Sequence, residues 1–308
     1  MANINWYPGH MHKASQEMRK IVPQVDLIIE ILDARIPFSS ENPMLAEIRG
    51  DKPCIKVLSK SDLADPIVTQ QWQDYLEQEK GVKTIALTTE EPEKMHGLLS
   101  LCHKMIPTKA NGSERLEALI MGIPNVGKST LINNLAGRTI AKTGNEPAVT
   151  KNQQRIKLDQ GVVLLDTPGV LWPKLENKHG GYRLAITGAI KETAVSNDDI
   201  AMYAVDYFRQ AYPDLLKARY QLDELPEDEL PLLEMIGAKR GCLRAGGRVD
   251  LDRAAKILLT EFRDITIGRI TLETPEMMEA ELIEMAEIRA EKEAKKAARK
   301  KKRNGSRD

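Results

Sequence analysis

A glycine-rich segment offers the clearest chemistry in this chain. Residues 122–129, Gly-Ile-Pro-Asn-Val-Gly-Lys-Ser, match the phosphate-loop pattern G-x-x-x-x-G-K-S/T between a predicted strand and a predicted helix. Glycines let backbone N–H groups converge on phosphate oxygens, and the N-terminus of the following helix favours negative charge. A simple glycine turn is the alternative, and the strand-to-helix context argues against it. The predicted nucleotide contacts are Asn125, Val126, Gly127, Lys128, Ser129 and Thr130, with Lys128 also serving catalysis.

Oxygen-bearing side chains in and after this loop suit a magnesium ion. Asp166 ends an apolar run and begins the segment D-T-P-G, so its carboxylate is expected at the strand edge where open α/β sheets bind ligands. Thr150 lies in a loop suited to ordering around Mg²⁺ and a γ-phosphate. We predict Ser129, Thr150 and Asp166 as metal ligands and Thr150 as a catalytic residue. Gly169 is predicted to contact the γ-phosphate through its N–H. A strand-to-turn junction and a solvated threonine are the alternatives.

A second short motif indicates which base is bound. Ser59-Lys60-Ser-Asp62 follows an apolar run near the start of the chain. A carboxylate at Asp62 can accept hydrogen bonds from guanine N1–H and N2–H₂, which adenine does not offer, while Lys60 packs over the base. Charged turns are common, so the motif is weak alone. Combined with the phosphate loop it favours GTP over ATP.

The hydrophobic pattern predicts the elements that position these residues. Apolar runs separated by helical patterns indicate a mostly parallel sheet with flanking helices, an α/β fold. After about residue 175 the alternation stops and the pattern is helical. The six strands are expected within 24–37, 52–63, 82–89, 114–122, 153–159 and 161–169, and the later helices within 197–220, 226–237, 249–264 and 275–303. We therefore predict a nucleotide-binding domain (1–175), an all-helical domain (176–285) and a basic tail (286–308).

Composition narrows the class of protein. The chain has 308 residues, 42% of them hydrophobic, and a formal net charge of zero. Ten Lys and Arg against three acidic residues give residues 289–308 a net +7, which leaves −7 for the rest. Such a tail suits a polyanion partner, although a disordered solubilising tail is the alternative. Three separated cysteines indicate buried thiols, and neither a signal peptide nor a membrane span is evident, so a cytoplasmic protein without membrane contact is expected.

The order of the motifs indicates circular permutation. In translation-factor-type GTPases the phosphate loop, switch threonine and D-T-P-G come before N/T-K-x-D, whereas here Lys60 and Asp62 come first. The chain resembles such a GTPase cut after D-T-P-G, with its old ends joined through residues 90–115. Permutation preserves strand neighbours because domain termini commonly lie close together. The helical domain then directly follows the Asp166 segment, so nucleotide state could be passed to it.

Five segments in this permuted order closely resemble one bacterial family. They are WYPGHMHKA, DARIPFSSENP, GIPNVGKSTLIN, DTPGVLWPK and RLAITGAIK, and the similarity extends over about residues 4–275. The chain is identified as a member of the ribosome biogenesis GTPase A family, also called YlqF or RbgA. The resemblance implies GTP hydrolysis stimulated by an immature large (50S) ribosomal subunit at a late assembly step. It also implies contact with ribosomal RNA by the helical domain of a monomeric protein.

The resemblance also assigns individual residues. Val170 stands where many GTPases carry a water-orienting Gln, and the family's candidate for that role is His10. Asn125 resembles the asparagine with which related GTPases use K⁺, and Thr88-Thr89 loosely match the segment behind the base. Two departures from the family pattern are Ser59, in place of the Asn of N-K-x-D, and Ala148, in place of a glycine.

Three functions remain to be distinguished. The first is a GTP-hydrolysing assembly factor for the large ribosomal subunit. The second is a nucleotide-gated RNA-binding module with negligible turnover, which Val170 and Ser59 favour. The third is an ATP-using P-loop metabolic enzyme, against which Lys60 and Asp62 argue. A glycine-flanked basic loop, with Lys239, Arg240, Arg244 and Arg248, is either a phosphate-contacting loop or a solvated turn.

Overall fold

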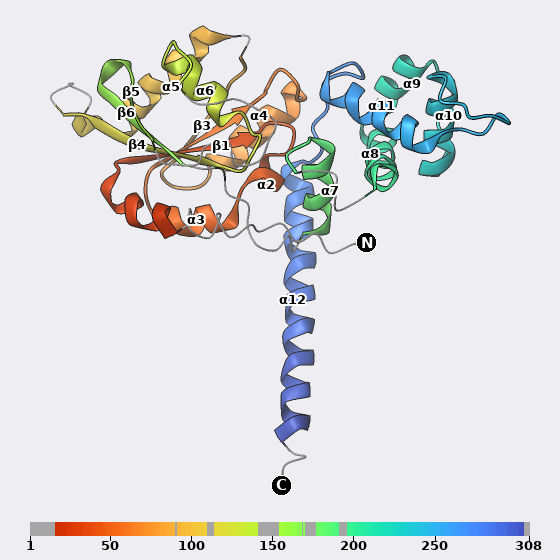
Figure 1. The fold of residues 1–308 in the computed structure, drawn as a ribbon. Helices are drawn as coiled ribbons and strands as arrows, with labels where there is room; N and C mark the ends of the chain where they lie inside the picture. Colours follow the sequence, from red (N-terminus) through yellow and green to blue (C-terminus); the bar gives the residue numbers. More distant parts are fainter. Residues whose placement is uncertain are drawn as a thin grey trace.

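A six-stranded mixed sheet forms the centre of the protein (Figure 1). The structure, a computed structural model, describes residues 16–89, 91–109, 114–140, 154–167, 169, 177–190 and 196–304. The strands are β1 (Leu27–Asp33), β2 (Cys54–Ser59), β3 (Val82–Ala86), β4 (Leu116–Gly122), β5 (Gln154–Lys157) and β6 (Val162–Asp166). Their order is β3-β2-β1-β4-β6-β5, and only β5 runs antiparallel to its neighbour. All six predicted strands and the α/β fold class are confirmed.

The sheet explains how motifs distant in sequence come together. β1 pairs with β2 on one side and with β4 on the other, so the first 118 residues build half of the sheet that contains the phosphate loop. β1 and β2 are buried along their whole length, as their apolar sequences predict. Parallel strands end at the same sheet edge, and β1, β2 and β4 therefore present their C-terminal residues together.

Helices cover both faces of this sheet. Figure 1 shows α3 on one face and α5 and α6 on the other. Side chains at the preceding residues cap two helices: Asn42 Oδ1 accepts from Met44 N, and Asp65 Oδ1 accepts from Ile67 N. Proline begins four of the five helices of this region, α2 to α5, where its missing N–H costs no helical hydrogen bond. The helices are α2 (Pro37–Ser40), α3 (Pro43–Arg49), α4 (Pro66–Leu76), α5 (Pro92–Met105) and α6 (Lys128–Leu135).

The C-terminal part is helical, as predicted, with two local differences. Pro213 starts a new helix, so the pattern at 197–220 folds as two helices rather than one. A short helix, α7, was not predicted from the sequence. The helices are α7 (Lys178–Ile186), α8 (Asn197–Ala211), α9 (Pro213–Tyr220), α10 (Glu229–Lys239), α11 (Leu251–Arg263) and α12 (Pro275–Asn304).

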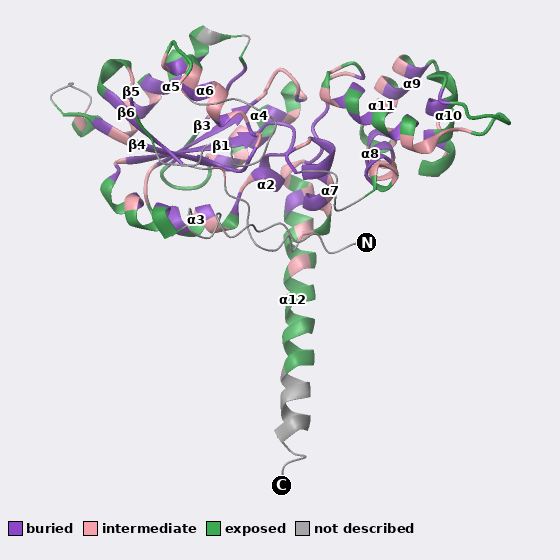
Figure 2. Ribbon diagram, in the orientation of Figure 1, coloured by how far each residue is buried: buried purple, intermediate pink, exposed green. Residues whose placement is uncertain are grey.

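The start of α12 is anchored on the sheet domain. Met278 is buried in a cluster with Trp72 of α4, and Trp72 Nε1 donates to the carbonyl oxygen of Glu273 at 2.9 Å. Buried Arg183 of α7 pairs with Glu273 (3.2 Å) and Glu281 (2.6 Å). Beyond this anchor α12 is mostly exposed and projects from the body (Figure 2). No helix among the described residues is long and apolar enough to cross a membrane.

Candidate nucleotide-binding site

The phosphate loop connects the end of β4 to the start of α6. Asn125 (φ 63°) and Gly127 (φ 92°) adopt left-handed backbone conformations, which Gly127 reaches without a side-chain clash. At Gly122 a Cβ would lie 2.9 Å from the carbonyl oxygen of Ile31 on β1. The pattern of glycines therefore follows from backbone geometry. Ser129 and Thr130 lie in the first turn of α6 and are half-buried.

Lys128 and Asp166 form an ion pair beside this loop. Lys128 Nζ pairs with Asp166 Oδ1, and both side chains are buried. Asp166 ends β6, whose register pairs it with Ile120 of β4, so adjacent strands bring the two residues together. The other carboxylate oxygen, Oδ2, is buried and has no hydrogen-bond partner within the described part of the chain. A buried carboxylate oxygen left without a donor is suited to a cation.

The D-T-P-G segment lies directly against the phosphate loop. Thr167 Oγ1 donates to the carbonyl oxygen of Ile120 at 2.8 Å. A Cβ at Gly169 would approach the backbone N of Pro124 to 3.0 Å, so glycine allows the close contact between the two segments. Gly169 therefore lies directly beside the phosphate loop, as its predicted contact with the γ-phosphate requires.

The motif Ser59–Asp62, predicted to bind the base and called here the base-reading segment, contacts the phosphate loop on the side opposite D-T-P-G. Lys60 Nζ donates to the carbonyl oxygen of Asn125 at 2.7 Å. Ser59 Oγ lies within hydrogen-bond distance of the carbonyl oxygens of Val126 (2.5 Å) and Leu32 (2.8 Å). Asp62 is half-buried in the turn that follows. The motifs that circular permutation separates in sequence thus meet at one sheet edge.

Thr88 and Thr89 lie next to the base-reading segment. Backbone hydrogen bonds connect Leu87 N to Leu58 O (2.9 Å) and Ser61 N to Leu87 O (3.2 Å). Thr88 is buried and Thr89 is exposed. This proximity is what a segment behind the base requires, although the contact with a base itself stays a prediction.

Two predicted residues cannot be located. His10 and Thr150 lie outside the described residues, as do Ala148 and Val170.

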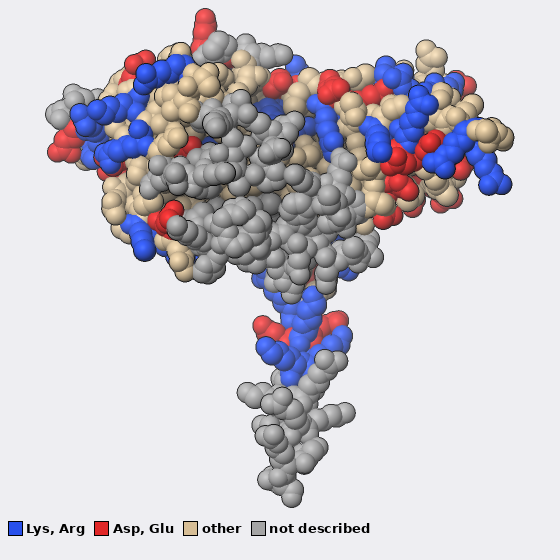
Figure 3. Space-filling model, in the orientation of Figure 1, with Lys and Arg blue, Asp and Glu red and all other residues tan. Residues whose placement is uncertain are grey.

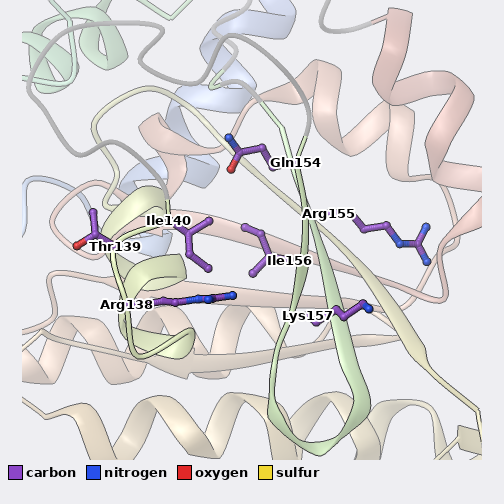
Figure 4. A pocket seen from close by; sticks show the side chains of 7 residues that line it. All are labelled: Arg138, Thr139, Ile140, Gln154, Arg155, Ile156 and Lys157. Atoms are coloured by element: carbon purple, nitrogen blue, oxygen red, sulfur yellow. The ribbon is translucent and has the colours of Figure 1, made fainter.

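A cavity of about 630 Å³ lies between the end of α6 and β5, beside the described residues that flank 141–153 (Figure 4). Its lining contains no predicted site residue and consists of Arg138, Thr139, Ile140, Gln154, Arg155, Ile156 and Lys157.

Sequence reasoning missed a buried group at this edge. Asp33, the last residue of β1, pairs with both Lys60 (2.9 Å) and Arg35 (2.8 Å). Burial alone would raise the pKa of Asp33, but Arg35 and then Lys60 lower it well below its usual range. Its position at the C-terminal end of a buried parallel strand was the available signal.

Comparison with known proteins identifies the family. Residues 117–235 match a profile described as "50S ribosome-binding GTPase". A ribosome biogenesis GTPase A from Priestia megaterium is 46% identical over 287 residues, which covers 91% of this chain and 99% of the relative. The chain belongs to the ribosome biogenesis GTPase A family. The Thermotoga maritima member is 30% identical over 273 residues, covering 89% of this chain and 95% of that protein.

Solved structures of this family share the fold. The GDP-bound structure of TM YlqF gives a TM-score of 0.61 at 26% identity, covering 84% of this chain and 99% of that chain. GNP-bound YlqF from T. maritima gives 0.60 at 27% identity, with 86% and 99% covered. As a member of the ribosome biogenesis GTPase A family, this chain is a GTPase and binds guanine nucleotide.

Proposed function

We propose that this GTPase is an assembly factor for the large (50S) ribosomal subunit and acts as a nucleotide-dependent switch at a late maturation step. The observation that carries the proposal is the contact between Lys60 of the base-reading segment and Asn125 of the phosphate loop, at one edge of a permuted sheet. The names of the relatives support the ribosomal assignment. Asp62 would select guanine, and the backbone of residues 125–130 would hold the phosphates.

A magnesium ion fits the residues at this site. Ser129, Thr150 and Asp166 would hold it, and the unpartnered Oδ2 of Asp166 is an oxygen available for that purpose. When bound, Mg²⁺ neutralises charge on the β- and γ-phosphates. Lys128 would turn from Asp166 toward the phosphates. Asn125 is proposed to admit K⁺ as a second neutralising ion.

His10 is the proposed water-positioning residue. Val170 cannot hydrogen-bond a water molecule, so another group has to orient the nucleophile. An imidazole that titrates near neutral pH suits that task.

Ribosomal RNA is the proposed partner of the helical region. In the basic loop, Arg240 pairs with Glu261 (2.6 Å) and Arg244 with Asp250 (2.8 Å). Arg248 is exposed and has no ion pair with a described residue, so it is the cation of this loop most available to a phosphate. The same proposal includes the predicted domain boundaries, which place the helical domain at residues 176–285.

The experiment that tests this function combines binding and turnover. The protein is sedimented with precursor and mature large subunits in GDP and in a non-hydrolysable GTP analogue, and GTPase rates are measured with and without the particles. Nucleotide-dependent association with the precursor and strong stimulation are expected. Equal association in GDP and in the GTP analogue would contradict the proposed nucleotide-dependent switch. Binding with negligible turnover would favour a nucleotide-gated RNA-binding module, for which the absence of Gln at Val170 is the specific observation.

A further inference from the structure

Asp33 is a buried carboxylate held between two cations. Its Oδ2 lies 2.9 Å from Lys60 Nζ and 2.8 Å from Arg35 Nη2, and its Oδ1 accepts from the backbone N and the Nε of Arg35, both at 3.0 Å. The backbone N of Asp33 donates to Ser40 Oγ at 3.0 Å. Because the side chain is 2% exposed and every one of these contacts is short, the carboxylate has one fixed orientation.

Lys60 transmits that orientation to the phosphate loop. Its ammonium group donates to Asp33 and, at 2.7 Å, to the carbonyl oxygen of Asn125. Its backbone is in the left-handed region, at φ 55°. A flexible lysine placed by a fixed anion loses less conformational entropy when a ligand packs on it.

Arg35 connects the same carboxylate to the helical region. Its guanidinium lies over the ring of Phe262 in α11, 5.4 Å from the centroid, and its carbonyl oxygen accepts from Leu272 N at 2.8 Å. Only 2% of Arg35 is exposed. The chain of contacts therefore runs from Asn125 through Lys60, Asp33 and Arg35 to α11.

We propose that Asp33 is a positioning residue of the guanine-nucleotide site, which acts through Lys60, and that Arg35 links this position to α11. The inference rests on the proposed nucleotide site and gives a role to a residue that lies in the segment DARIPFSSENP but outside the phosphate loop, D-T-P-G and the Ser59–Asp62 motif. A purely structural ion pair is the competing explanation. It predicts losses in stability without a loss in nucleotide affinity that depends on Lys60.

A double-mutant cycle separates the two explanations. GDP affinity is measured by fluorescence titration for the wild type, Asp33→Asn, Lys60→Met and the double variant, with thermal stability recorded without nucleotide. We expect each single change to weaken binding by about 10-fold, since a hydrogen bond to a charged group is lost. The double variant should be no more than about 2-fold weaker than Lys60→Met. Losses that multiply, or no loss in Asp33→Asn, overturn the proposal.

Base selectivity and Arg35 give independent readouts. Asp33→Asn should weaken GTP and ITP equally, because Lys60 contacts any purine, whereas Asp62→Asn should weaken GTP more than ITP. The same cycle with Arg35→Met in place of Asp33→Asn tests the contribution of Arg35. It also replaces the first cycle if Asp33→Asn does not fold. We expect a loss that disappears in the Lys60→Met background, and a loss that persists there overturns the link. A wild type that does not bind GDP would overturn the proposed site itself, whereas normal wild-type binding with multiplicative losses overturns only this inference.

Discussion

We predict that guanine selection depends on the carboxylate of Asp62, which follows Lys60 in the turn after β2. Asp62→Asn places amide hydrogens where guanine also has hydrogens, so GTP binding should fall about 10- to 100-fold. Xanthosine triphosphate, with a carbonyl at that position, should bind better to the variant than to the wild type. Competition against a fluorescent GDP measures both changes. Asp51→Asn, at an exposed position, is the matched control, and an equal loss of GTP and its xanthine analogue would contradict the assignment.

Catalysis makes a different prediction for His10. His10→Ala should lower particle-stimulated turnover by about 10²- to 10⁴-fold, the usual contribution of a proton-accepting side chain, with GTP affinity changed less than about 3-fold. Single-turnover rates with saturating ribosomal particles give the first quantity, and equilibrium titration gives the second. His96→Ala, on the exposed surface of α5, controls for loss of an imidazole elsewhere. Parallel losses in affinity and turnover would show that His10 binds nucleotide instead.

Single residues show where sequence reasoning reached its limit. The spacing of Lys128 and Asp166 predicted a shared site, and adjacent strands bring them into contact. Ser59 was interpreted only as a departure from the Asn of N-K-x-D. Its hydroxyl lies 2.5 Å from the carbonyl oxygen of Val126, a tether between two loops that depends on tertiary distance and cannot be derived from spacing. The role of Asp33 was missed because Lys60 reaches it only across the sheet edge, although its place at the end of a buried parallel strand was a signal.

At the scale of elements, two helical glycines should respond oppositely to alanine. Gly237 in α10 is buried, and a Cβ there would lie 2.6 Å from Val249 Cγ1 and 2.9 Å from Ala254 Cβ. Gly237→Ala should therefore destabilise the protein by about 1–3 kcal/mol. Gly97 in α5 is exposed with its nearest neighbour at 3.8 Å, so Gly97→Ala should stabilise by about 0.5–1 kcal/mol. Urea unfolding of both variants checks the pair, and the same sign for both would be inconsistent with this packing.

The face of the sheet beneath α3 contains a buried acid with a raised pKa. Glu30 on β1 is in register with Lys56 on β2, and Lys56 Nζ donates to Glu41 Oε1 at 2.7 Å. Burial, followed by Glu41, raises the pKa of Glu30 to about 8, while Lys56 and Arg49 oppose this. One carboxylate oxygen of Glu30 has no hydrogen-bond partner among the described residues. Burial therefore favours the protonated, neutral form of Glu30 in the folded chain.

This pKa predicts how stability changes with pH. Between the ordinary value of 4.5 and about 8 the unfolded chain releases a proton that folded Glu30 retains, so this group makes stability fall as pH rises across that window. Glu30→Gln, which imitates the neutral acid, should remove the fall. The variant should match the wild type near pH 5 and exceed its stability by a few kcal/mol at pH 9. Urea unfolding at both values tests this, and a constant difference between variant and wild type would show that Glu30 does not titrate there.

Elements were predicted unequally, and for physical reasons. β1, β2, β4 and β6 are apolar runs that the sheet buries almost completely, so their sequences indicated strands. The edge strands β3 and β5 are partly exposed and were also predicted. α7 was missed because its first turns contain Gly180 and Gly181, which disfavour helix. Arg183, pairing with Glu273 and Glu281 far along the chain, stabilises α7 through contacts that no local window contains.

At the scale of the whole molecule, one long helix, α12, projects from the body and carries a concentration of basic residues. α12 extends 30 residues, and within the described part of the chain its start lies against the body while the rest projects from it (Figure 1). Lys and Arg side chains gather on its described part, with acidic residues between them (Figure 3). The sequence predicted both the charge of this tail and a helix at 275–303, but not how that helix is anchored, because the anchor depends on packing of Met278 and on the ion pair between Glu281 and Arg183.

Removing the tail should separate RNA affinity from folding. A chain ending at Ile288 keeps the anchor at Met278 and Glu281 but loses a net charge of +7, so its melting temperature should stay within about 2 °C of the wild type. Its association with precursor particles should weaken and depend less steeply on salt, because fewer counterions are released on binding. Sedimentation at several salt concentrations between 50 and 200 mM measures this dependence. We expect the affinities of the two chains to differ by about tenfold or more. A full-length variant with the seven basic residues at 295, 296 and 299–303 changed to Gln loses the same net charge of +7 and controls for chain length. If the two variants differ, the helix itself contributes contacts; if neither changes the salt slope, the basic tail is a solvated extension and RNA is bound elsewhere.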